Sequence, residues 1–147
     1  RRGTSIHLIC EKFLLNSEPY SEKEMPSNVD MFKTIKPFME EHIDCVYGVE
    51  LALYSDFLRA AGRTDAIVSW DGKMTILDFK TARKPKKEEW IQNYFIQTTV
   101  YSLMFEEVYG VKVPQIAILI GVDHEDPQLF VRKSKDYYQA VKDIFIF

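Results

Sequence analysis

The pattern of apolar and polar positions divides the chain into helical and strand-like segments. Near the N-terminus, apolar side chains recur every three or four positions, which is typical of helices that bury one face. We expect a helix from Thr4 to Leu15, a polar loop from Ser17 to Asn28 and a second helix from about Val29 to His42. Pro37 should kink or divide the second helix, because proline lacks an N–H and clashes with the preceding turn.

The middle of the chain is strand-like. Side chains alternate from Cys45 to Tyr54, and two further runs, Arg59–Trp70 and Lys73–Lys80, are separated only by Asp71-Gly72. Asp-Gly between two apolar runs is the strongest short-range signal for a β-hairpin. If these residues form a two-residue turn, Trp70 faces Lys73, and the register places Asp65 opposite Asp78 and Arg63 opposite Lys80.

The remaining segments complete an alternating order of strands and helices. They are a basic loop, Thr81–Lys87; a long helix, Glu88–Tyr109, stopping at Gly110; a buried strand, Gln115–Val122; an edge strand, Gln128–Arg132; and a final helix from Ser134. This order predicts an α/β fold in which a mixed central β-sheet is flanked by helices. We expect residues 1–147 to form a single domain, because the length is near the commonest domain size.

Composition narrows the class of protein. The chain carries a net charge of −3, which argues against wholesale electrostatic coating of nucleic acid. A local basic patch exists nevertheless in the loop after Lys80. No apolar run is long enough to span a bilayer and no signal peptide is evident, so we expect an intracellular protein without a membrane partner. The start at Arg1 rather than Met is typical of a fragment or of a domain cut from a longer protein.

Cysteine content excludes some metal centres. Cys10 and Cys45 are the only cysteines, so they cannot complete a four-cysteine zinc or iron–sulfur site. A disulfide between them is possible, but buried free thiols in a reducing compartment fit the sequence better.

The two aspartates of the hairpin are the main chemical signal. Side chains alternate with period two, so Asp65, Asp78, Arg63 and Lys80 should project from one face. Carboxylates about 5 Å apart repel by roughly 3 kcal/mol at an effective dielectric near 20. A divalent cation would offset that repulsion, and oxygen donors suit Mg²⁺ or Mn²⁺. Lys80 could then orient an attacking water or stabilise charge that develops on a phosphate.

A structural interpretation competes with the metal site. The same four residues could form a salt-bridged quartet at an exposed sheet end, and a β-bulge near the turn would break the register. Two helical pairs four residues apart, His7 with Glu11 and Gln97 with Tyr101, are each weak evidence by themselves. A basic loop is usually a solvated run, but here it adjoins the proposed site, where a phosphodiester backbone needs neutralising.

Together these motifs resemble a known family. Gly3-Thr4-x-x-His7, Gly62-Arg63-Thr64-Asp65, Asp78-Phe79-Lys80-Thr81 and Gln97-x-x-x-Tyr101 occur in the order seen in RecB-like nucleases of the PD-(D/E)xK superfamily. The stretch from Glu50 to about Tyr101 is most similar to the mitochondrial genome maintenance exonuclease family, with its phage and bacterial relatives. The resemblance implies a restriction-endonuclease-like core.

The resemblance also implies roles for individual residues. Asp65 and Asp78 match the acidic metal ligands, and the Phe79 carbonyl is the usual third contributor. Lys80 matches the catalytic lysine. The remaining matches are His7 as a further metal ligand, Gln97 and Tyr101 as the helix pair that supports the lysine or the DNA, and Glu50 where many relatives place another acid. We expect DNA contacts from Arg63, Thr81, Arg83, Lys84, Lys86 and Lys87.

The predicted function follows from these matches. We expect a DNA exonuclease that uses one or two Mg²⁺ or Mn²⁺ ions, has no iron–sulfur cluster, and acts on single-stranded DNA or DNA ends in replication, recombination or repair. Hydrolysis in this superfamily leaves a 5′-phosphate and a 3′-hydroxyl. Two alternatives stay open: a non-catalytic DNA-binding module of the same fold, and the nuclease domain of a helicase–nuclease complex. The expected location is a bacterial or phage-infected cytoplasm, or the mitochondrial matrix.

Overall fold

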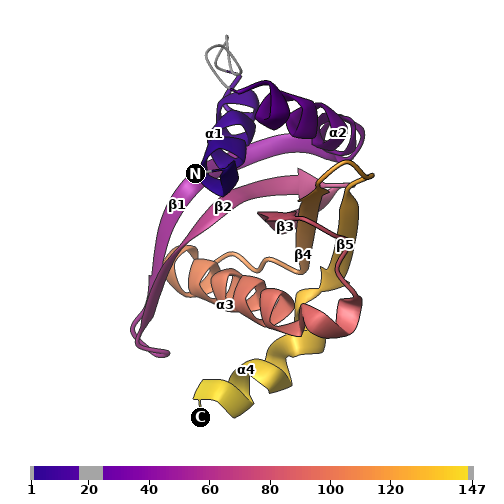
Figure 1. The fold of residues 1–147 in the computed structure, drawn as a ribbon. Coiled ribbons are helices and arrows are strands. Elements are labelled where there is room, and N and C mark those ends of the chain that lie inside the picture. The colour runs from indigo at the N-terminus through magenta and orange to yellow at the C-terminus, as the bar shows by residue number, and fades with distance from the viewer. Residues whose placement is uncertain (1, 17–24, 146–147) are drawn as a thin grey trace.

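A five-stranded mixed sheet with helices on both faces organises the molecule (Figure 1). The computed structural model describes residues 2–16 and 25–145. The strands are adjacent in sequence order; β3 and β4 run parallel, and the other neighbouring pairs run antiparallel. The elements are α1 (Arg2–Leu14), α2 (Pro26–His42), β1 (Ile43–Ser55), β2 (Ala60–Trp70), β3 (Lys73–Ala82), η1 (Glu88–Trp90), α3 (Gln92–Tyr109), β4 (Gln115–Val122), β5 (Gln128–Lys133), η2 (Ser134–Tyr137) and α4 (Tyr138–Phe145).

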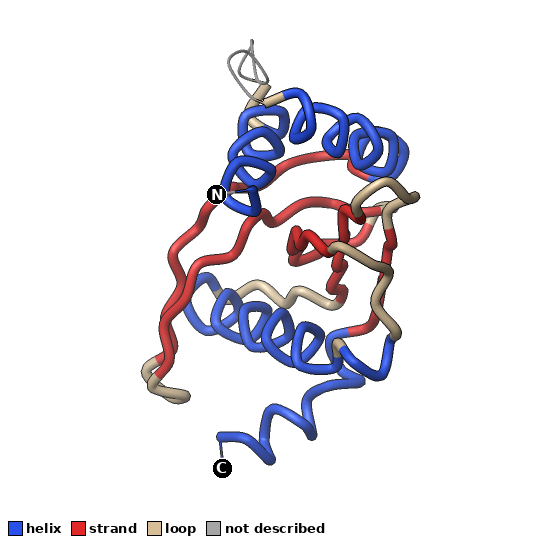
Figure 2. The backbone as a smooth tube through the Cα atoms, viewed as in Figure 1, coloured by secondary structure: helices blue, strands red, loops and turns tan. Residues whose placement is uncertain are grey.

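The sheet separates two hydrophobic cores. Helices α1 and α2 cover one face and α3 covers the other, as the tube view also shows (Figure 2). Because side chains alternate along a strand, neighbouring residues of β3 enter different cores: Leu77 packs under α1 and α2, and Ile76 packs under α3. The same alternation directs Asp78 and Lys80 to the α3 side. This confirms the expected α/β fold, a mixed sheet flanked by helices.

Most predicted elements are present, with differences at the helices; the expected final helix from Ser134 begins as η2, and α4 starts only at Tyr138. Helix α2 begins at Pro26, earlier than expected, because proline suits the first position of a helix. Pro37 does not divide α2, and Ile35 and Met39 remain buried on either side of it. The expected long helix from Glu88 is divided: η1 comes first, and α3 starts only after Ile91, whose φ of −118° is not helical. Part of the expected loop, residues 17–24, lies outside the described residues.

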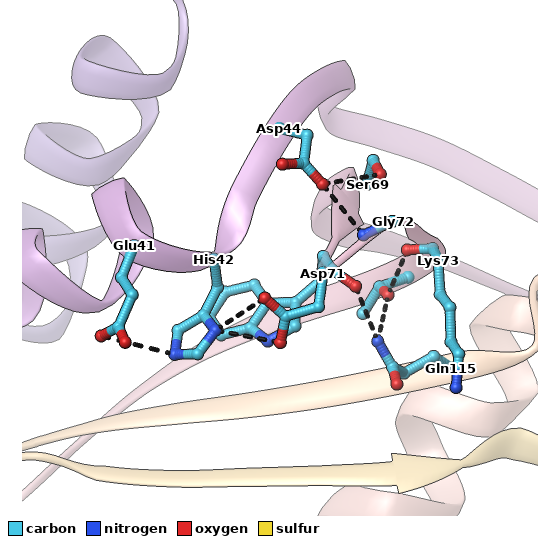
Figure 3. A network of polar contacts seen from close by, with 10 residues as sticks. Glu41, His42, Asp44, Ser69, Asp71, Gly72, Lys73 and Gln115 are labelled. Atoms are coloured by element: carbon cyan, nitrogen blue, oxygen red, sulfur yellow. Dashed lines mark hydrogen bonds and ion pairs between the residues drawn. The ribbon is translucent and has the colours of Figure 1, made fainter.

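The predicted hairpin turn forms at Asp71-Gly72. Both residues have positive φ, 52° and 81°, as a type I′ turn requires. A polar network fastens this turn to the end of α2 (Figure 3). Nδ1 of His42 lies 2.9 Å from Oδ1 of Asp71, and the imidazole stacks on the buried Trp70 ring. The Gly72 N–H donates to Oδ2 of Asp44 at 2.9 Å. The turn is thereby held against the helical layer.

The cysteines are not joined. Cys10 is buried and Cys45 is exposed, so the expectation of two buried thiols is wrong for Cys45. No helix among the described residues is long and apolar enough to cross a membrane.

Candidate active site

The candidate site lies where β2 and β3 separate. Their ladder ends at the pair of Ala66 with Leu77, one step before the expected pair of Asp65 with Asp78. Beyond that point a side chain joins the strands, because Oδ2 of Asp65 accepts a hydrogen bond from the Phe79 N–H at 2.7 Å. The expected pairing of Arg63 with Lys80 is wrong: β2 leaves β3 and continues alongside β1, where Arg63 faces Ala52.

A histidine from the helical layer reaches this gap. Nε2 of His7, on α1, lies 3.3 Å from Oδ2 of Asp65. The His7 ring also meets the Phe79 ring edge-on, with 6.1 Å between centroids. Because the ladder is interrupted here, a residue of the α1 layer contacts a carboxylate that belongs to the sheet.

Asp78 and Lys80 occupy the α3 side of the gap. The Asp78 side chain is only 10% exposed, and its Oδ2 lies 3.1 Å from Nζ of Lys80. The ammonium also lies over the Tyr94 ring, 4.7 Å from its centroid. Apart from the ion pair with Lys80, Oδ2 is a buried oxygen without a hydrogen-bond partner among the described residues. A carboxylate oxygen paired with one cation still has a lone pair for a further ligand.

The pKa values of the two aspartates are shifted in opposite directions. Burial, reinforced by the charge of Asp65, raises the pKa of Asp78 to about 7 against the opposing effect of Lys80. Burial also acts to raise the pKa of Asp65, but hydrogen bonds with His7, Asp78 and the Phe79 N–H outweigh it and lower that pKa. Near neutral pH the pair therefore holds Asp65 ionised and Asp78 close to its titration midpoint, a division of roles that active-site carboxylates often show.

Glu50 lies beside this pair. The register of β1 with β2 places it opposite Asp65, between the pairs Val49 with Ala66 and Leu51 with Thr64. Its φ of 48° is left-handed, which is uncommon for a non-glycine residue in a strand. Burial, then the charges of Asp65 and Glu11, raise the pKa of Glu50. A carboxylate held in strained backbone beside two others fits a cation-binding group.

The two expected residues of helix α3, Gln97 and Tyr101, differ in their burial. Tyr101 is half-buried, and burial together with the charge of Asp78 raises the pKa of its hydroxyl. Gln97 is exposed and lines, with Tyr101 and Asn93, a cavity of about 330 Å³. The Tyr101 ring occupies the space of an absent side chain: a Cβ at Gly62 would lie 2.7 Å from its Cε1. Gly62 therefore makes room for the ring.

Sequence reasoning missed Tyr94. This residue touches Lys80 and lies one helical turn before Gln97, so the spacing of Tyr94, Gln97 and Tyr101 on one helix could have revealed it.

The basic loop adjoins the site through Thr81, which directly follows Lys80. Thr81, Arg83, Lys84 and Lys86 line one hollow. Arg63 lies apart from them, and its Nη1 donates to the Glu50 carbonyl at 2.8 Å. Of the residues expected to contact DNA, those of the loop therefore lie together, and Arg63 lies apart from them beside Glu50.

The donor set fits a hard divalent cation. Asp78 offers a buried oxygen without a hydrogen-bond partner, and Asp65 contacts both Asp78 and His7. These three residues meet through Asp65 rather than as a closed cage: within residues 2–16 and 25–145, no group of three or more His, Cys, Asp and Glu side chains is arranged to hold a metal.

Comparisons with known proteins place the chain in a superfamily and find a similar fold. The sequence profile of the PD-(D/E)XK nuclease superfamily matches residues 29–144. A solved structure of a candidate exonuclease from Eubacterium rectale is similar over 99% of this chain, with a TM-score of 0.64 and 12% identity. The chain spans 64% of that protein. A second match, to the structure of SSO0001, covers 98% of this chain and 74% of that protein at 13% identity. Its TM-score is 0.44, so no argument is based on it. The search of curated proteins found no match.

Proposed function

The chain belongs to the PD-(D/E)XK nuclease superfamily, and from this premise we propose that it is a metal-dependent DNA exonuclease of the RecB-like branch. The proposed substrate is single-stranded DNA or a DNA end, processed during replication, recombination or repair. We treat residues 1–147 as one nuclease domain, related to the mitochondrial genome maintenance exonuclease and its phage and bacterial relatives. We expect the protein to act in a bacterial or phage-infected cytoplasm, or in the mitochondrial matrix.

One observation carries the proposal: the buried Asp78 oxygen has no hydrogen-bond partner among the described residues, yet it faces Lys80 and neighbours an ionised Asp65. Structural carboxylates are normally satisfied by donors when they are buried. Crowded, incompletely paired carboxylates with an adjacent lysine are typical of a site that awaits a cation and a phosphate.

The residues divide into holding and reacting groups. Asp65, Asp78, the Phe79 carbonyl and His7 would hold Mg²⁺ or Mn²⁺, with Glu50 as a further candidate. Such an ion polarises a phosphoryl oxygen and lowers the pKa of a bound water. Lys80 keeps its positive charge: burial acts to lower its pKa, but the charge and hydrogen bonding of Asp78 together with the charge of Asp65 outweigh burial and raise it. Its ammonium is thus preorganised to stabilise negative charge on the attacked phosphate.

Two groups on α3 complete the arrangement. Tyr94 lies against the Lys80 ammonium and favours its position by a cation–π contact. The Tyr101 hydroxyl stays protonated at neutral pH, because burial and Asp78 raise its pKa, and it is available as a hydrogen-bond donor to substrate.

Digestion of end-labelled DNA tests the proposal. Single- and double-stranded substrates, labelled at the 5′ or the 3′ end in separate reactions, are incubated with Mg²⁺, with Mn²⁺ or with EDTA. We expect metal-dependent release of short products that carry 5′-phosphates and 3′-hydroxyls. If the protein saturated with either metal cuts none of the substrates, the non-catalytic DNA-binding alternative replaces the enzyme.

A further inference from the structure

The two tryptophans of the chain have opposite environments. Trp70 is completely buried under α1 and α2, whereas Trp90, the last residue of η1, is 60% exposed. Tryptophan offers a large apolar surface that folding normally covers, so a ring left mostly in water needs an explanation. Trp90 follows the basic loop, ten residues after Lys80 along the chain.

Trp90 forms one wall of the hollow beside that loop. The hollow measures about 520 Å³ and is lined also by Thr81, Arg83, Lys84 and Lys86. Its size lies within the range of small-molecule sites. Nζ of Lys87 lies 5.2 Å from the Trp90 ring centroid, which adds a cation at the aromatic surface. A flat aromatic ring among cations is the combination that binds unpaired nucleotides, by stacking the base and neutralising the phosphate.

The loop is held in place rather than left to fold around a ligand. The Lys86 N–H donates to Oε1 of Gln128, and Nε2 of Gln128 donates to the Lys86 carbonyl, both at 2.8 Å. This reciprocal pair fixes the loop to β5. Of the two acids of η1, Glu88 is paired with Arg132, which reduces its repulsion of an anionic ligand, and Glu89, next to Trp90, is exposed to solvent that screens its charge.

We propose that Trp90 and the basic loop form a base-stacking site for an unpaired nucleotide of single-stranded DNA. This inference rests on the proposed nuclease function and specifies its substrate: the strand entering the Asp65–Asp78 site is unpaired next to the scissile phosphate. Thr81 relates the two, because it lines the hollow and follows Lys80 on β3, so the hollow and the site lie at the same end of that strand. Paired DNA cannot use the ring in this way, since its bases are already stacked on each other.

Tryptophan fluorescence provides a direct test, because Trp70 is shielded and Trp90 is exposed. The protein is titrated with oligo(dT) in EDTA, which prevents metal-dependent cleavage. We expect stacking to quench the Trp90 emission. An abasic oligonucleotide of the same length carries the phosphates without bases and should bind without this quenching. Equal quenching by both strands would overturn the proposal.

Substitution of Trp90 provides a second test of the stacking site. Trp90→Ala should weaken oligo(dT) binding by about 5- to 150-fold, the loss expected for one stacked base, and abolish the quenching. Binding of a blunt hairpin duplex should be unchanged. Tyr109→Ala is the matched control, since Tyr109 is also an exposed aromatic residue and lies at the opposite end of α3, an 18-residue helix about 27 Å long at 1.5 Å per residue. Retained Trp70 emission and near-UV circular dichroism confirm that each variant is folded.

The outcomes separate this site from the nuclease itself. Quenching that depends on bases, in a protein that never cuts DNA, supports the stacking site and contradicts the enzyme. Cleavage of single strands at an unchanged rate and affinity in Trp90→Ala supports the enzyme and overturns the stacking site. Equal weakening by Trp90→Ala and Tyr109→Ala would also overturn it, because the effect would not be local to the hollow.

Discussion

The β2–β3 hairpin has a histidine–aspartate contact at each end. At the turn, His42 from α2 contacts Asp71, whose side chain is 60% exposed. Where the strands separate, His7 from α1 contacts Asp65, whose side chain is 15% exposed. Both histidines come from the same helical layer, so the difference lies in the carboxylates and their surroundings.

At the turn, the carboxylates lie where water and protein donors satisfy them. Asp71 accepts from His42, and Asp44 accepts from the Gly72 N–H (Figure 3). At the open end, Asp65 and Asp78 are crowded, one buried oxygen lacks a hydrogen-bond partner within the described residues, and the pKa of Asp78 is raised to about 7. The comparison indicates that the turn stabilises the fold, whereas the open end keeps crowded carboxylates that protonation of Asp78 or a bound cation would stabilise.

The largest expected effect is a difference in cleavage activity between substitutions at the open end and at the turn of the hairpin. Asp78→Asn should abolish cleavage and metal-induced stabilisation, since it removes a charged ligand but little volume. Its free energy of unfolding should be unchanged or higher, because a buried charge is lost. Asp71→Asn should retain cleavage, and asparagine tolerates the positive φ of the turn. End-labelled digestion and thermal unfolding, with and without Mg²⁺, measure both quantities. Equal activity in the two variants would remove the distinction.

A second effect concerns the lysine at the open end. Lys80→Ala should lower the cleavage rate by about 10²–10³, as removal of a preorganised charge-stabilising group does. Metal and DNA binding should remain, because no ligand atom is lost. Lys73→Ala, next to the turn, is the control and should cut at the wild-type rate. A Lys80→Ala protein that cuts as fast as wild type would show that the lysine has another role.

The pH dependence of stability should also distinguish the ends. Asp78 has a pKa raised from 3.8 to about 7, so across this window the folded protein keeps a proton that the unfolded chain has released. The free energy of unfolding without metal should therefore fall as pH rises from about 4 to 7. Asp65, whose pKa is lowered, acts in the opposite sense: its contribution is present above pH 3.8 and is lost as pH falls.

Denaturant unfolding in EDTA at several pH values checks this dependence. The decline between pH 5 and 8 should be smaller in Asp78→Asn than in wild type, and Mg²⁺ should restore stability to wild type at pH 8. Asp71→Asn should follow the wild-type curve across this range. Parallel curves for wild type and Asp78→Asn would contradict the assignment.

The smallest effect is expected at the turn. His42→Gln removes the contact with Asp71 and the stacking on Trp70, and should lower the free energy of unfolding by about 1 kcal/mol. Cleavage should be unchanged when it is measured well below the melting temperature. A large loss of activity without loss of stability would indicate that the turn communicates with the open end.

The predictability of the fold depended on local signals. The Asp71-Gly72 turn and the register next to it followed from the sequence, because a type I′ turn fixes which residues face each other. Gly110 ended α3 in the left-handed conformation, as expected. The division at Ile91 was not predicted, because the burial of that side chain depends on residues distant in sequence.

The candidate site was predictable as a set of residues, and its detailed contacts were not. The spacing of Asp65 and Asp78 indicated neighbouring carboxylates, and the motif order indicated His7 and Lys80. The expected Arg63–Lys80 pair failed because β2 leaves β3 to follow β1, which is a competition between two partner strands. Tyr94 and the room made by Gly62 were missed, since both depend on how closely α3 packs against the sheet.

The sequence by itself determined the order of elements, the hairpin turn, the pair of aspartates and the basic loop, because each depends on residues close together in the chain. Only the tertiary structure decided that the ladder stops at Ala66 and Leu77, that His7 enters the resulting gap, and that one Asp78 oxygen stays buried beside Lys80. The physical reason is that burial and charge proximity, which set these contacts and the pKa of Asp78, arise where α1, α3 and the sheet meet. No local pattern in the chain specifies that meeting point.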